Sequence, residues 1–108
     1  MPLSVDEQKD IRDKVVETIQ GIYDPEIPVN IYDLGLIYNI DLNEKGELEI
    51  KMTLTSPSRP AAEILPPEVE QKTGAVEGVT ECTVHVVWDP TWTPEMMSEE
   101  AKLELNMF

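Results

Sequence analysis

Thiol and imidazole groups are nearly absent from this chain of 108 residues, which has one cysteine, Cys82, and one histidine, His85. One cysteine excludes an internal disulfide and any Cys-x-x-Cys metal knuckle. One histidine excludes a histidine-rich metal centre and leaves no second imidazole for acid–base catalysis. The composition therefore fits a protein of the reducing cytoplasm, and we expect no metal site and no catalytic set built on these groups.

Basic residues are also scarce: 8 Lys and Arg stand against 22 Asp and Glu, and the formal net charge is −14. This charge repels nucleic-acid phosphates and anionic lipid, so we expect neither nucleic acid nor a membrane as a partner. No apolar run approaches the ~18 residues that span a bilayer, and residues 1–7 lack the features of a secretory signal. Basic protein surfaces and metal cations remain as partners, unless the acidity serves solubility alone.

The length and the 41% hydrophobic content predict one globular domain over residues 1–108. A first helix is expected from about residue 5, where Ser4 and Glu7 form a capping-box signature. One apolar helix face follows, made of Ile11, Val15, Ile19 and Ile22. We expect this helix to end near residue 21.

Three strands are predicted from alternating apolar and polar residues. Residues 36–42 and 47–54 alternate in this way on either side of a glycine-containing turn at 43–46, which predicts an antiparallel hairpin. The third strand is expected over residues 82–88, with Cys82 and Trp88 on the same side.

A second helix is predicted to follow the hairpin, beginning near residue 59 with Ser58 as its cap. Pro66 and Pro67 are expected to kink or restart it, because proline removes a backbone donor inside a helix. The element order predicts an α/β (α+β) fold, a two-layer α-β-β-α-β sandwich with helices on one face of a small sheet.

Cys82 and His85 are three residues apart on the third predicted strand and therefore point to opposite faces. They cannot ligate one ion together without a bulge. Cys82 is expected as a small buried hydrophobe and His85 as an ordinary surface or interface residue.

Three carboxylates, those of Asp24, Glu26 and Asp33, gather in the loop after the first helix. Paired carboxylates can perform acid–base catalysis or hold a divalent cation. Aspartate beside proline, or before Leu-Gly, also caps turns, and we favour this role. No serine has a histidine placed to activate it and no phosphate-binding glycine loop is present, so the residues do not predict an enzyme.

The segment after the third predicted strand is rich in proline and large apolar side chains. Its candidates for protein docking are Trp88, Trp92, Met96 and Met97. Tryptophan and methionine are enriched at protein interfaces, which favours docking. The alternative is that the segment folds back and closes the core, and the sequence leaves both readings open.

Three segments resemble the SufT/PaaD-like iron–sulfur assembly family and occur in the family's order. They are 24–37 (DPEIPVNIYDLGLI), 52–62 (MTLTSPSRPAA) and 87–101 (VWDPTWTPEMMSEEA). The resemblance implies an α/β fold, no hydrolytic or redox activity, and a role in maturing iron–sulfur proteins. It also implies scaffold, carrier and client proteins of that pathway as partners.

The functional positions that the resemblance implies are the loop of Asp24, Pro25 and Glu26, and the loop that enters the second helix. Where the family pattern usually has cysteine, this chain has Arg59, so it is either a paralogue without the thiol or a substituted form. A thiolate at a helix N-terminus could ligate iron, whereas a guanidinium cannot. We therefore expect no bound cofactor and a role in docking.

Three alternatives follow from the same pattern. The chain could carry iron or a cluster transiently through the acidic first loop. It could be an accessory protein of an oxygenase that degrades aromatic acids of the phenylacetate type, a role that the PaaD-like branch allows. It could also form a homodimer, for which we expect the third strand as the interface, because sheet edges are usually covered, charged or paired.

Overall fold

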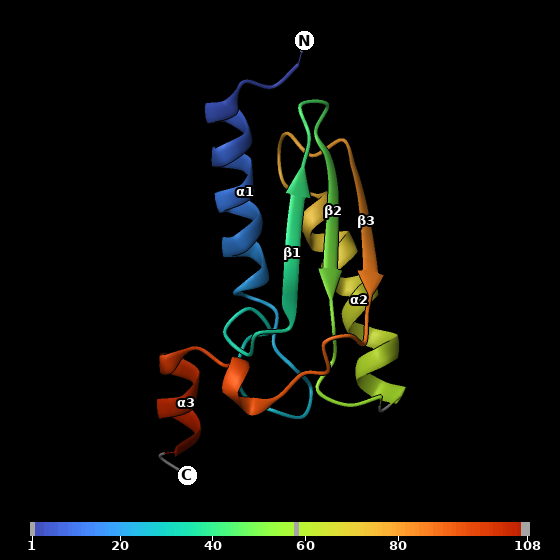
Figure 1. The fold of residues 1–108 in the computed structure, drawn as a ribbon. Coiled ribbons are helices and arrows are strands. Elements are labelled where there is room, and N and C mark those ends of the chain that lie inside the picture. The colour runs from blue at the N-terminus through green and yellow to red at the C-terminus, as the bar shows by residue number, and fades with distance from the viewer. Residues whose placement is uncertain (1, 58, 107–108) are drawn as a thin grey trace.

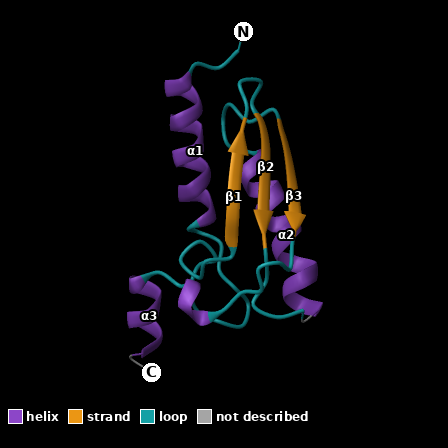
Figure 2. Ribbon diagram, viewed as in Figure 1, coloured by secondary structure: helices purple, strands orange, loops and turns teal. Residues whose placement is uncertain are grey.

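The computed structural model describes residues 2–57 and 59–106, a small sheet with helices packed against it (Figure 1, Figure 2). In chain order the elements are α1 (Val5–Ile19), β1 (Ile37–Leu42), β2 (Glu47–Met52), α2 (Arg59–Gly74), β3 (Glu81–Val86), the 3-10 helix η1 (Pro94–Met96) and α3 (Glu99–Asn106). The predicted α-β-β-α-β order is confirmed, and η1 and α3 follow it. Within the described ranges, no helix is long and apolar enough to cross a membrane.

The sheet has the strand order β1-β2-β3, so β2 lies in the centre. β1 and β2 pair antiparallel, as the hairpin prediction required. β2 and β3 pair parallel, with Leu48 opposite Cys82 and Lys51 opposite His85. Parallel neighbours need a crossover connection, and α2 supplies it by returning the chain from the end of β2 to the start of β3.

One face of the sheet carries the core. Along β2, Leu48, Ile50 and Met52 are fully buried, whereas the residues between them are exposed. The buried faces of α1 and α2 belong to the same core cluster, and α2 lies behind the sheet in Figure 2. α1 contacts both α2 and β1. The predicted two-layer sandwich is therefore confirmed.

Of the two alternatives predicted at Pro66 and Pro67, the second helix overturns the restart. α2 is continuous over Arg59–Gly74 and contains both prolines. Its buried side chains recur every four residues, at Ala61, Leu65, Val69 and Thr73. The carbonyls that lose their N–H partners belong to residues 62–63, which are exposed, so water can satisfy them.

The third strand is shorter than predicted. β3 ends at Val86, not at Trp88, and Trp88 is 48% exposed instead of continuing the buried side. The physical reason lies in the neighbouring strand. The N–H of Val87 donates to the carbonyl oxygen of Met52 at 2.8 Å, and Met52 is the last residue of β2, so the chain beyond it leaves the ladder.

Candidate functional site

Most of the predicted site residues meet at one end of the sheet. β2 and β3 end there, β1 begins there, and the first residue of α2 is close by in the chain (Figure 1). Three segments form this end, 20–36, 53–57 and 87–98, and we call it the loop end. It holds the acidic first loop, the entrance to α2 and the proline-rich segment after β3.

Asp24 organises the first loop from a position that is only 5% exposed. Its Oδ1 accepts hydrogen bonds from the backbone N–H groups of Glu26 at 2.7 Å and Ile27 at 3.0 Å. Its own N–H donates to the carbonyl of Val29 at 3.2 Å. The turn-capping role predicted for this aspartate is confirmed. Pro25 and Glu26 are thereby held on the exposed side of the turn.

Asp33 caps the second half of the loop together with Asn30. The N–H of Asp33 donates to Asn30 Oδ1 at 2.9 Å, and Asn30 Nδ2 donates to Asp33 Oδ2 at 2.8 Å. The carbonyl of Asp33 accepts from the N–H of Ser98 at 2.8 Å, which ties this loop to the start of α3. Asn30 was not predicted as a site residue, although asparagine is one of the residues whose side chain commonly caps a turn.

The first loop and the segment after β3 hold each other in place. Trp92 Nε1 donates to the carbonyl of Leu34 at 2.6 Å, and the Tyr38 hydroxyl donates to the carbonyl of Pro90 at 2.7 Å. Trp92 and Met97 pack against the hydrophobic core. Of the four predicted docking residues, Trp92, Met96 and Met97 thus help to close this end of the molecule, and Trp88 is the most open to solvent.

Two exposed aromatic residues that the sequence analysis missed also lie in the first loop. Tyr23 is 60% exposed and Tyr32 is 38% exposed, so with Trp88 the loop end presents three accessible aromatic side chains. Each of the two tyrosines directly follows a buried isoleucine, Ile22 or Ile31, and precedes an aspartate. Aromatic side chains in such positions are the residues that most often anchor protein interfaces.

Residues 12–86 match the iron–sulfur cluster assembly protein family. The chain belongs to this family. It is 47% identical over 92 residues to an Fe-S protein maturation auxiliary factor of Porphyromonas gingivalis, covering 85% of this chain and 88% of that protein. It is 37% identical over 97 residues to the Fe-S protein maturation auxiliary factor YitW of Bacillus subtilis, covering 90% of this chain and 95% of that protein.

A solved structure confirms the fold. The crystal structure of a domain of unknown function from Bacillus anthracis superposes with a TM-score of 0.88 at 33% sequence identity. The likeness covers 97% of this chain and 100% of that one. The family predicted from three sequence segments is confirmed by the family match and by these relatives.

Arg59, at the position where the resemblance led us to expect cysteine, is the first residue of α2. The side chain of Arg59 and the predicted cap Ser58 lie outside what the structure describes. Within the described ranges, no three His, Cys, Asp or Glu side chains are grouped so that they could hold a metal ion.

The one thiol lies away from the loop end, on the helix-facing side of β3, and it is half-buried where the sequence predicted a buried residue. Cys82 Sγ is 3.2 Å from Thr73 Oγ1, between β3 and the last turn of α2. Burial raises the pKa of the Cys82 thiol, and the hydrogen bond to Thr73 offsets this only in part. His85 is exposed on the opposite face of β3, so the predicted separation of the two groups is confirmed.

We expect Cys82 to alkylate slowly in the folded protein, because the raised pKa lowers the fraction of reactive thiolate below that of a free thiol. The measurement is the rate of iodoacetamide labelling at neutral pH, by mass spectrometry, in buffer and in urea. Unfolding should increase the rate, because it removes the burial that raises the pKa of the thiol. Since the folded pKa is raised, the stability linked to this group is fully present below the unfolded pKa and is lost as pH rises through the folded pKa. Equal rates in buffer and urea would contradict this account.

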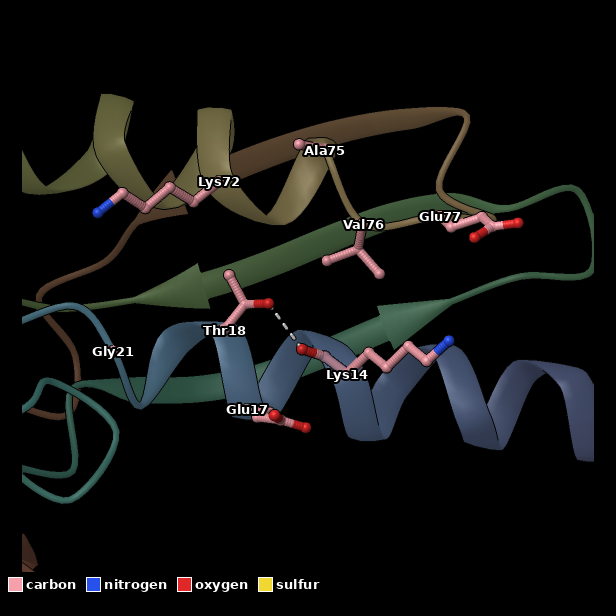
Figure 3. A pocket seen from close by; sticks show the side chains of 8 residues that line it. All are labelled: Lys14, Glu17, Thr18, Gly21, Lys72, Ala75, Val76 and Glu77. Atoms are coloured by element: carbon pink, nitrogen blue, oxygen red, sulfur yellow. Dashed lines mark hydrogen bonds between the residues drawn. The ribbon is translucent and has the colours of Figure 1, made fainter.

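A groove of about 610 Å³ lies elsewhere, between α1 and the C-terminal end of α2 (Figure 3). Its walls carry both charges, but Figure 3 shows Lys14 and Lys72 pointing in opposite directions. Thr18 Oγ1 is occupied by a hydrogen bond to the carbonyl of Lys14 at 2.8 Å. The groove therefore brings together no nucleophile and base, and the loop end remains the candidate site.

Proposed function

We propose that this protein is an auxiliary factor in the maturation of iron–sulfur proteins and that it acts by docking, without catalysis. The observation that carries the proposal is the 47% identity to a protein named an Fe-S protein maturation auxiliary factor, across 85% of this chain. The cluster is cargo in this proposal. It stays on scaffold, carrier and client proteins, which are the partners we infer.

The loop end is the docking surface in this proposal. Its backbone is fixed by the Asp24 and Asp33 caps and by the Trp92 hydrogen bond, so the segments need little ordering on binding. A rigid loop lowers the entropic cost of association, and the exposed Tyr23 and Trp88 supply the apolar area.

Arg59 supports docking over cluster transfer. A guanidinium has five donors and no lone pair for iron, and it can pair with carboxylates of a partner. The pKa of Cys82 is raised by burial, and this thiol lies between β3 and α2, so it does not replace a ligand at the helix start.

The test is the specific activity of aconitase, an iron–sulfur enzyme, in a bacterial strain that lacks its copy of this gene. We expect the deletion to lower the activity several-fold, and we expect this chain and its Arg59→Cys variant to restore it equally. Arg12→Cys is the matched control, because it makes the same chemical change on α1, away from the loop end.

Two outcomes would contradict the proposal. If only Arg59→Cys restored aconitase, a thiolate at the start of α2 would be required and docking alone would be insufficient. If the deletion left aconitase unchanged, the chain would serve no general maturation pathway. Arg12→Cys should give the same aconitase activity as the unchanged chain in every case, since a difference between these two would show that an added surface thiol itself alters the result.

A further inference from the structure

The outer edge of β3 is an unpaired edge of the sheet. β3 is the last strand in the order β1-β2-β3, and Figure 1 shows it at the margin with α2 behind it. The N–H of Val87 points to β2, because it donates to Met52. Backbone groups alternate along a strand, so those of Cys82, Val84 and Val86 point away from β2. Within residues 2–57 and 59–106, no strand pairs with that side.

The side chains of this edge are also incompletely covered. Cys82, Val84 and Val86 share the helix-facing side of the sheet with Leu48 and Ile50 of β2. The β2 residues are at most 1% exposed, whereas the three β3 residues are only half-buried. The apolar surface on the helix-facing side of the sheet therefore extends to the β3 edge, where it is partly exposed to solvent.

We propose that β3 pairs antiparallel with β3 of a second copy of this chain, about a two-fold axis at Thr83. The two sheets join into one sheet of six strands. Cys82 then lies opposite the partner's Val84, and their outward backbone groups exchange hydrogen bonds. The half-buried apolar strips of both copies meet on the helix side, so the pairing covers the surface that one copy leaves open.

The side chains on the sheet face away from the helices favour this register. With the axis at Thr83, Glu81 lies opposite the partner's His85, whose ring N–H can donate to the carboxylate. Thr83 lies opposite the partner's Thr83. Both kinds of cross-strand pair are favourable. A two-fold axis at Glu81 would place the two Glu81 carboxylates opposite each other. An axis at Val84 would place Glu81 opposite the partner's Val87. A two-fold pairing uses the same edge on both copies and closes at a dimer.

The net negative charge of each copy should weaken the homodimer at low salt. Each copy carries −14, so two copies repel one another at long range. That repulsion is screened beyond about 8 Å at physiological ionic strength, whereas the paired edge acts at contact distance. We therefore expect association that tightens as salt is raised from low to physiological concentration.

A disulfide-trapping series tests the register directly. Three variants on a Cys82→Ala background each place one thiol on the exposed face of β3: Glu81→Cys, Thr83→Cys and His85→Cys. Only residue 83 lies opposite its own copy, within the Cβ separation that a disulfide needs. We expect Thr83→Cys to form a covalent dimer at least ~10-fold faster under mild oxidation than either neighbour. Equal rates in the three variants, or no dimer in any, would overturn the proposal.

A charge exchange tests the same pairing without thiols. His85→Glu sets two carboxylates opposite each other at two symmetric points and should weaken the dimer about 10-fold in Kd by sedimentation equilibrium. The exchange Glu81→His with His85→Glu restores both pairs and should return the wild-type Kd. Circular dichroism checks that each variant is folded. A wild-type chain that stays monomeric at about 1 mM, or an exchanged variant that stays weakened, would overturn the proposal.

Discussion

Replacing Trp92 by alanine should lower the free energy of unfolding by about 2–4 kcal/mol. The indole packs against the hydrophobic core, and its Nε1 donates to the carbonyl of Leu34 at 2.6 Å. Truncation removes this packing and leaves the Leu34 carbonyl without its donor. The measurement is urea unfolding followed by far-ultraviolet circular dichroism, which does not depend on the lost fluorophore.

Two variants divide this effect into its parts. Trp92→Phe keeps a ring in the core and removes the hydrogen bond, so it should cost about 1–2 kcal/mol. Trp88→Ala is the matched control: Trp88 is 48% exposed and does not belong to the hydrophobic core cluster, so its cost should stay below about 1 kcal/mol. If Trp92→Ala were as mild as Trp88→Ala, Trp92 would not close the core, and the docking alternative would be favoured for both tryptophans.

Local signals in the sequence were sufficient for the elements themselves. Ser4 and Glu7 form the predicted capping box, in which Ser4 Oγ accepts from the N–H of Glu7 and Glu7 Oε1 accepts from the N–H of Ser4. Alternation along residues 47–52 predicted which side chains of β2 are buried. Such signals succeed because each depends on residues that are only two to four positions apart.

Local sequence patterns did not predict the contacts between residues that are far apart in the chain. Trp92 and Leu34 are 58 positions apart, and nothing near either residue shows that the indole meets that carbonyl. Periodicity indicates that a strand has an apolar face, but it does not identify the neighbouring strand. The parallel pairing of β3 with β2 was therefore not predicted. The continuity of α2 was missed because a local rule for proline ignores the packing of Leu65 and Val69, which holds the helix together.

In the candidate site, too, roles that depend on neighbouring residues were predicted, whereas contacts between distant segments were not. Asp24 was assigned a turn-capping role from the residue beside it, and its hydrogen bonds to the next two residues after Pro25 agree. The assembly of one loop end from three segments needed the fold, since these segments are far apart in sequence. The family came from motif order over nearly the whole chain, which no argument from periodicity could supply.

Gly35→Ala is the second change for which we expect a large loss, about 2–4 kcal/mol in the free energy of unfolding. Gly35 has φ +83°, a left-handed conformation that alanine adopts only with strain. A Cβ there would lie 2.9 Å from the carbonyl carbon of Met96 and closer still to its oxygen. The backbone of η1 would have to move away from the first loop, and the contacts of Trp92 would loosen with it.

Gly21→Ala is the matched control, because a Cβ at Gly21 would meet nothing closer than the carbonyl oxygen of Thr18 at 3.4 Å. Thermal and urea unfolding should place this variant within about 1 kcal/mol of the wild type. Since Gly35 and Trp92 act on the same junction, Gly35→Ala with Trp92→Ala should cost less than the sum of the single changes. Strict additivity would mean that the two residues stabilise separate parts of the molecule, and the loop end would then not be the single rigid surface on which the docking proposal depends.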